Sequence, residues 1–199
     1  EQSYVINSVA RGANMMAAVT ATAADTHLSF KNLCSYLCVE LYGKDVTLRS
    51  MKLEANGGEK IAGTFSLSAN GASPEVKASE NAVPYITLTL GNGVALSDSA
   101  AKPTKFFFAT LPTTLADGYT LTAQDSSGKT FVVVSEQPLT LERNEVQTVK
   151  AVEVIPIATE IKGLTAPKSI DLPAQSLNCP TYNFGSTTED ITLSTKEQW

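Results

Sequence analysis

Residues 119–135 read YTLTAQDSSGKTFVVVS, and this stretch decides the fold class. Its two flanks, 119–124 and 129–135, are rich in Thr and Val, residue types that suit the pleated surface of a strand. Between them, Asp125 to Gly128 are residue types typical of a tight turn. The stretch therefore predicts two antiparallel strands joined by a four-residue loop.

The same pattern extends over residues 26–155. Turn signals recur every 8–14 residues there, and no helical stretch alternates with the strands. Such spacing is typical of an all-β domain rather than a parallel β/α fold. We predict an antiparallel β-sandwich of transthyretin-like or Greek-key type, with about eight strands.

Local patterns give more specific predictions. Leu28 and Phe30 are expected on one face of a first strand. The apolar positions change from even to odd numbers near 32–35 and again near 49–50, which predicts a bulge at each place. At 32–35 one helical turn is the alternative. The turn 56–58 predicts a hairpin, because residues 60–69 then alternate apolar and polar for ten positions. Residues 85–90 form another expected strand, closed by the turn at 91–93.

The flanking segments differ from this domain. Residues 1–25 are rich in Ala and Thr, and we interpret them as an inter-domain segment or the tail of a missing first domain. Residues 156–199 are punctuated by prolines, with short strand candidates at 170–172 and 191–193. We interpret this part as a linker followed by a second small β module or a docked extension.

Composition restricts the partners. The net charge is −5 and the lysines are scattered, so no basic stripe exists for a nucleic-acid backbone. No apolar run approaches the ~18 residues of a membrane-spanning helix. Cys34, Cys38 and Cys179 are too few and unevenly spaced for a disulfide framework, and Cys34 and Cys38 are expected to be small buried hydrophobes.

Residues that could carry chemistry are sparse. His27 is the single histidine and has no sequence partner for a metal site or a catalytic triad. Residues 125–128 lack the ligands of a calcium loop, and 91–93 lack the Lys and helix of a phosphate loop. We predict no catalytic, metal-binding or cofactor-binding residues and no cofactor, although the sequence leaves open that two carboxylates converge in space.

Two apolar features could serve interaction. Phe106 to Phe108 are interpreted mainly as core, with a subunit contact as the alternative. Residues 146–157 are interpreted as an ordinary final strand, or alternatively as an edge strand able to pair with another chain. Pro156 would limit that pairing to one side.

An ordered set of segments resembles the second domain of the fimbrillin-like pilins and adhesins of the Bacteroidales. The set comprises LSFKNLCSYLCVELYG, VTLRSMKLEANGGEKIAGTFSLS, YITLTLGNGVALS, FFFATLPTTLADGYTLTAQDSSGKTF and PLTLERNEVQTVKAVEV. The resemblance implies a transthyretin-like sandwich on the outer membrane, exported as a lipoprotein and assembled by strand donation. The family is processed after an Arg, but Arg11 does not clearly occupy that position, and we expect an ordinary exposed residue.

Function is therefore expected to be non-enzymatic. The first hypothesis is a subunit or adhesin component of a cell-surface fimbrium, whose partners are other fimbrial subunits or copies of itself. The second is a monomeric surface lipoprotein that binds host glycan or protein through loops such as 70–84 and 97–104. The third is an accessory module of a larger exported enzyme.

Overall fold

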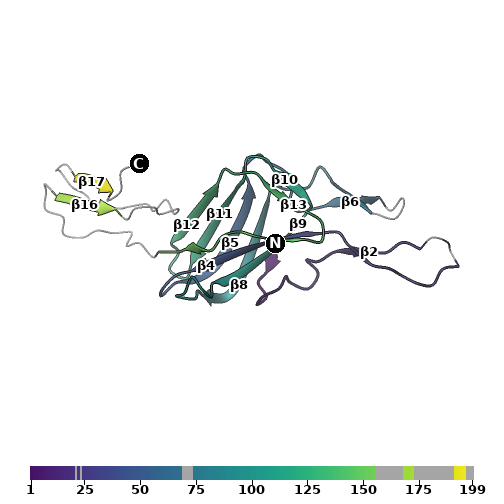
Figure 1. Cartoon of the computed structure of the whole chain (residues 1–199), viewed down its shortest axis with the longest axis horizontal. Coiled ribbons are helices and arrows are strands. Elements are labelled where there is room, and N and C mark those ends of the chain that lie inside the picture. Colours follow the sequence, from purple (N-terminus) through teal and green to yellow (C-terminus); the bar gives the residue numbers. More distant parts are fainter. Residues whose placement is uncertain (21, 23, 69–73, 156–167, 173–190, 196–199) are drawn as a thin grey trace.

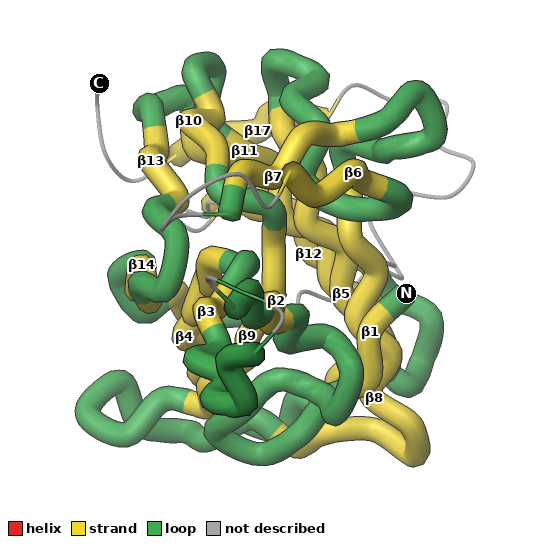
Figure 2. The backbone as a smooth tube through the Cα atoms, turned by 90° about the vertical axis from the view of Figure 1, so that its right-hand side faces the viewer, coloured by secondary structure: helices red, strands yellow, loops and turns green. Residues whose placement is uncertain are grey.

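A computed structural model of the chain describes residues 1–20, 22, 24–68, 74–155, 168–172 and 191–195. The described chain consists of strands and loops throughout (Figures 1 and 2). The all-β prediction is confirmed. No helix of the described part has the length and apolar character needed to cross a membrane.

The first sheet contains five strands. Their order is β1 (Gln2–Ser3), β8 (Tyr85–Ala95), β5 (Thr47–Ala55), β11 (Tyr119–Asp125) and β12 (Thr130–Ser135). The pairs among β8, β5, β11 and β12 are antiparallel, whereas β1 runs parallel to β8. The predicted bulge near 49–50 is confirmed, because the register between β5 and β8 shifts between Leu48 and Ser50.

The second sheet is built around β4 (Ser35–Tyr42). On one side β4 pairs antiparallel with β9 (Thr104–Thr110). On the other side it pairs with two short strands, β14 (Val146–Thr148) and β15 (Val152–Glu153), and both run parallel to it. The final strand predicted at 146–157 is thus two short strands at the edge of this sheet, the second ending at Glu153, and Pro156 lies outside the described residues.

Short strand pairs surround the two sheets. They are β10 (Thr113–Leu115) with β13 (Leu139–Leu141), β6 (Phe65–Ser68) with β7 (Glu75–Ala78), β2 (Met16–Ala17) with β3 (Lys31–Asn32), and β16 (Lys168–Leu172) with β17 (Ile191–Thr195). The strands predicted at 170–172 and 191–193 fall within β16 and β17. Hairpin β6–β7 and the loop bearing β2 and β3 both project from the sandwich (Figure 1).

One apolar core joins the two sheets. The alternation of β4 turns Leu37, Val39 and Leu41 inward, and β9 adds Phe106 and Phe108, all at most 1% exposed. The facing sheet contributes Leu48, Met51 and Leu53 of β5 together with residues of β8, β11 and β12. The β-sandwich prediction is confirmed, and eight strands from residues 26–155 build its two sheets.

The predicted hairpin around 56–58 is wrong. β5 lies in the middle of its sheet and pairs with β8 and β11, so it has no free side for the segment that follows it. Of the alternating residues that the structure describes, 60–68, only Phe65–Ser68 forms a strand, and its partner is β7. Gly63, within this segment, has a φ of 101°, a backbone conformation that favours glycine.

Two other local predictions are also wrong. Leu28 and Phe30 lie outside any strand and are 59% and 62% exposed, although their alternation predicted a half-buried strand. Residues 91–93 do not end the strand at 85–90, because β8 continues to Ala95. Gly91 and Gly93 adopt positive φ values of 55° and 104°, which lets the strand bend without ending.

The position of the three phenylalanines gives a test of the core. Phe106→Ala removes a fully buried ring and is expected to lower the free energy of unfolding by about 3–5 kcal/mol. Phe107→Ala, at the neighbouring half-buried position on the other face of β9, is the matched control and should cost clearly less. Chemical denaturation measures both, and equal losses would contradict the assigned strand parity.

Candidate functional site

The residues singled out as possible reactive groups are dispersed. Among the described residues, no three His, Cys, Asp or Glu side chains are grouped so that they could hold a metal ion. The side chain of His27 is 98% exposed, and its Nδ1 lies 3.6 Å from Oδ1 of Asp25. The structure therefore places the single histidine on a projecting loop rather than at a strand end in the sandwich.

The two thiols that the structure describes are buried, as predicted. Burial raises the pKa of both Cys34 and Cys38 above the ordinary value, and the nearby Glu40 carboxylate raises that of Cys38 further. A raised pKa leaves little thiolate at neutral pH, so both thiols are poor nucleophiles. Cys179 lies outside the described residues.

The loop at 125–128 is a turn, as predicted. Oδ1 of Asp125 accepts hydrogen bonds from the main-chain N–H groups of Ser127 and Lys129, each at 2.8 Å, and from the Ser127 hydroxyl at 2.7 Å. Gly128 has a φ of 87°, which closes the connection between β11 and β12. One carboxylate oxygen thus organises the hairpin.

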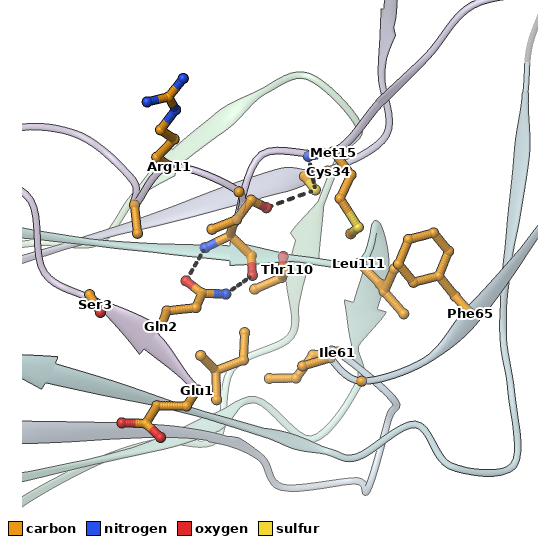
Figure 3. Close-up of a pocket in the computed structure, with 17 residues that line it drawn as sticks. Glu1, Gln2, Ser3, Arg11, Met15, Cys34, Ile61, Phe65, Thr110 and Leu111 are labelled. Carbon is orange, nitrogen blue, oxygen red and sulfur yellow. Dashed lines mark hydrogen bonds between the residues drawn. The ribbon is translucent and has the colours of Figure 1, made fainter.

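One lateral side of the sandwich is closed by the N-terminal strand. β1 pairs with β8 of the first sheet, and the Gln2 side chain reaches β9 of the second sheet. Its Nε2 donates to the carbonyl of Ala109 at 2.6 Å, and its Oε1 accepts from the N–H of Ala109 at 3.1 Å (Figure 3). The amide side chain therefore replaces the peptide group of a missing neighbouring strand.

A cavity of about 520 Å³ lies beside this closure. Its walls include apolar side chains, among them Ile61 and Leu111, together with the loop at residues 10–13. Cys34 is held at its inner side, with Sγ 3.5 Å from both the carbonyl of Ala13 and the N–H of Met15. Arg11 belongs to the lining, but its guanidinium points away from the other labelled side chains (Figure 3).

The opposite lateral side of the first sheet ends in β12, which pairs only with β11 among the described strands. The main-chain N–H of Ala55 donates to the carbonyl of Pro84, on the side of β8, and the N–H of Asn56 donates to the carbonyl of Gly118. Since main-chain groups of successive residues alternate in direction, the N–H and C=O of Tyr119 point away from β5 and toward β12. Tyr119 lies opposite Ser135, so the main-chain groups of Val132 and Val134 point away from β11. Among the described residues, no hydrogen-bond partner of these groups is found.

A groove of about 450 Å³ runs between this edge and the edge of the second sheet. Val133 and Tyr119 line it from the first sheet, and Val149 and Val152 line it from the segment that carries β14 and β15. Val133 belongs to the core, and both Val149 and Val152 pack against the core while remaining partly exposed. The lining also includes polar and charged residues, namely Ser135, Glu136, Gln137 and Lys150. The groove is therefore of mixed polarity and lies beside the outer edge of β12, and we call it the edge groove.

Sequence reasoning identified only part of this arrangement. The final strand at 146–157 was recognised as a possible edge, and it does form one wall of the groove. The exposed edge of β12 and the closing role of Gln2 were missed, since strand order does not follow from periodicity. The uncharged run at 130–135 is the one signal in the sequence that could have indicated an unprotected edge.

Comparison with known proteins adds no relative: no protein-family model matches the chain, and no curated protein matches it.

The Gln2 closure can be tested by substitution. Gln2→Ala removes two hydrogen bonds and should lower the free energy of unfolding by about 1–2 kcal/mol. It should also speed hydrogen exchange at the Ala109 amide, which loses its acceptor. Ser3→Ala, at the exposed neighbouring residue, is the control and should change stability by less than about 0.5 kcal/mol. Unchanged exchange at Ala109 in Gln2→Ala would contradict the assigned role.

The hydroxyl of Tyr119, which lines the edge groove, is expected to make the free energy of unfolding depend on pH. Burial raises the pKa of its hydroxyl above the ordinary value of 10.0 in the folded chain. The unfolded chain then loses this proton first, so the related stability is present below pH 10 and is lost as the pH rises toward the folded-state pKa. Tyr119→Phe should reduce the loss of stability measured by denaturation above pH 10, and an unchanged alkaline profile would contradict the prediction.

Proposed function

We propose that the chain is a structural module of a cell-surface fibre that assembles by strand pairing at the edge groove. It is non-enzymatic in this proposal, and its partners are other fibre subunits or copies of itself. The single observation that carries the proposal is the outer edge of β12, which pairs with no second strand among the described residues and lies beside the edge groove. Main-chain hydrogen bonds would supply the strength of the contact, and side-chain pockets would set its register.

The chemistry of β12 supports this role. Soluble proteins normally protect an edge strand with charge, proline, a bulge or a very short length. β12 has the sequence TFVVVS over six residues and contains neither a charge nor a proline. An edge of this composition is a template for another strand.

The edge strand β9 of the second sheet carries such protection. Pro103 precedes β9, and Lys105 within it forms an ion pair with Glu40 at 3.1 Å. Gln2 occupies the far end of the same strand at Ala109. The contrast between β9 and β12 argues that the exposure of β12 is used.

The resemblance to fimbrillin-like proteins gives this proposal its biological setting. An exported lipoprotein family on the outer membrane that polymerises by strand donation would require a sandwich with one accessible edge. We therefore propose cell-surface localisation, a fimbrial role and a transthyretin-like kind of sandwich for this chain. The edge groove supports the assembly step of that proposal, and the resemblance supports the remainder.

A proline in β12 tests the proposal. Val134→Pro removes an N–H that the fold itself does not use, and adds a ring at the edge, where proline is tolerated. Assembly measured by analytical ultracentrifugation or electron microscopy should be lost, while the circular dichroism spectrum is retained. Val134→Ala keeps the N–H and should still assemble.

Two outcomes would count against the proposal. If Val134→Pro assembles as the native chain does, the contact does not use this edge. If the native chain stays monomeric at the highest attainable concentration, the role of a monomeric surface protein that binds through its loops becomes the better one.

A further inference from the structure

Part of β8 lies outside every strand ladder of the sandwich. Opposite the single residue Arg49 of β5, β8 inserts residues 90–93, and the register pairs none of them with a residue of β5. On the other side of β8, the short strand β1 pairs only with Leu88 and Thr89. Among the described strands, residues 90–93 therefore have no partner, and we call them the β8 bulge.

The β8 bulge contains an asparagine followed by a glycine. Asn92 is exposed, and among the described residues no group makes a hydrogen bond to its carboxamide. Gly93 has a φ of 104°, and a β-carbon at this position would lie 2.8 Å from Cγ2 of Thr47. The fold thus requires glycine at 93, and it places that glycine directly after an untethered asparagine.

We propose that Asn92 is a site of spontaneous deamidation through a succinimide. The main-chain nitrogen of Gly93 attacks Cγ of Asn92, so that an N–Cγ bond forms and the Cγ–Nδ2 bond breaks. Nδ2 leaves as ammonia, and the proton lost by the attacking N–H balances the proton that the leaving group gains. Water then adds at one of the two ring carbonyls and opens the ring to aspartate or isoaspartate. Water is the one co-reactant.

Two properties of the β8 bulge favour this reaction. Glycine has no side chain that could hinder the approach of its nitrogen to Cγ. The main chain at 92–93 also belongs to no strand pair, so the two reacting atoms can come together without opening a ladder. The same two residues inside a paired strand would first have to leave their partner strand.

A second Asn-Gly pair of the described chain has the opposite geometry. Asn56 is also exposed, but its Nδ2 donates to the carbonyls of Asp117 at 2.9 Å and Ser135 at 3.1 Å. Its Oδ1 accepts from the hydroxyl of Thr120 at 2.7 Å. These bonds hold both ends of the carboxamide, and its rotation toward the nitrogen of Gly57 would break them. Exposure does not distinguish the two asparagines, whereas hydrogen bonding does.

The β8 bulge can accept either product of the reaction. Isoaspartate lengthens the main chain by a methylene group, which would shift the register of a paired strand but meets no pairing at 92. Aspartate adds a negative charge near Arg49, whose Nη1 donates to the carbonyl of Gly91 at 3.2 Å. Deamidation should therefore change the surface charge and leave the sandwich intact.

Timed peptide mapping of the full chain tests the proposal. The folded protein is held at neutral pH and physiological temperature, and mass spectrometry follows the change from amide to carboxyl group at Asn92 and at Asn56. Asn92 should react about tenfold faster than Asn56 or more, because the reaction at Asn56 must first break hydrogen bonds. Isoaspartate among the products identifies the succinimide, since direct hydrolysis of the amide yields aspartate alone.

The unfolded chain and two variants are the controls. In denaturant both Asn-Gly pairs should react at comparable rates, because the fold no longer distinguishes them. Asn92→Gln has a longer side chain that would have to close a larger ring, so it should keep its amide and melt as the native chain does. Thr120→Ala removes one of the bonds to Asn56 and should speed the reaction at Asn56, with no change at Asn92.

Three results would overturn the proposal. The first is an Asn92 that keeps its amide in the folded chain and loses it in denaturant, because the β8 bulge would then be too rigid for the attack. The second is an Asn56 that reacts as fast as Asn92 in the folded chain. The third is a product that contains aspartate without isoaspartate. A lower melting temperature of the deamidated protein would contradict the tolerance of the β8 bulge.

Discussion

The structure depends on apolar contact between two sheets. Phe106 and Phe108 of β9, with the inward residues of β4, meet the inward residues of β5, β8 and β11 in one core. Buried area of this kind is the main favourable term in folding, at roughly 25 cal/mol for each Å² of apolar surface removed from water. Because both sheets use alternate residues for this contact, the remaining half of each strand faces outward. The edges of the two sheets are then the places where backbone pairing is incomplete.

The two lateral sides of the sandwich differ in how the backbone of their edge strands is paired. On one side, β1 adds a strand to the first sheet and Gln2 supplies an amide to β9 in the second. On the other side, β12 and the segment of β14 and β15 border a groove of mixed polarity, and the outer backbone of β12 has no partner among the described residues. A side-chain amide can pair with one peptide group, whereas pairing along the whole outer edge of β12 takes a second strand. This asymmetry is the physical basis for the proposed assembly.

Strand identity was largely predictable, whereas strand partnership was not. The hairpin of β11 and β12 followed from Thr- and Val-rich flanks around Asp125, and the bulge in β5 followed from a change of parity. The hairpin predicted from the alternation after residue 58 does not form, because β5 already pairs with β8 and β11. The strand predicted around Leu28 and Phe30 does not form, for a different reason. A projecting loop and a half-buried strand in a sheet can have the same alternation of apolar and polar residues, and only the position of the other elements distinguishes them.

The sequence by itself determined the all-β class, the inward parity of the main strands, the turn at Asp125 and the burial of Cys34 and Cys38. These properties are local, since they depend on the residue types within a few positions of each other. Tertiary structure alone decided that β14 and β15 run parallel to β4, that Gln2 bridges two sheets, and that β12 lies at an edge. Those features join residues as much as 111 positions apart, such as Leu41 and Val152. The order in which strands meet is set by the packing of the whole core, and no local pattern records it.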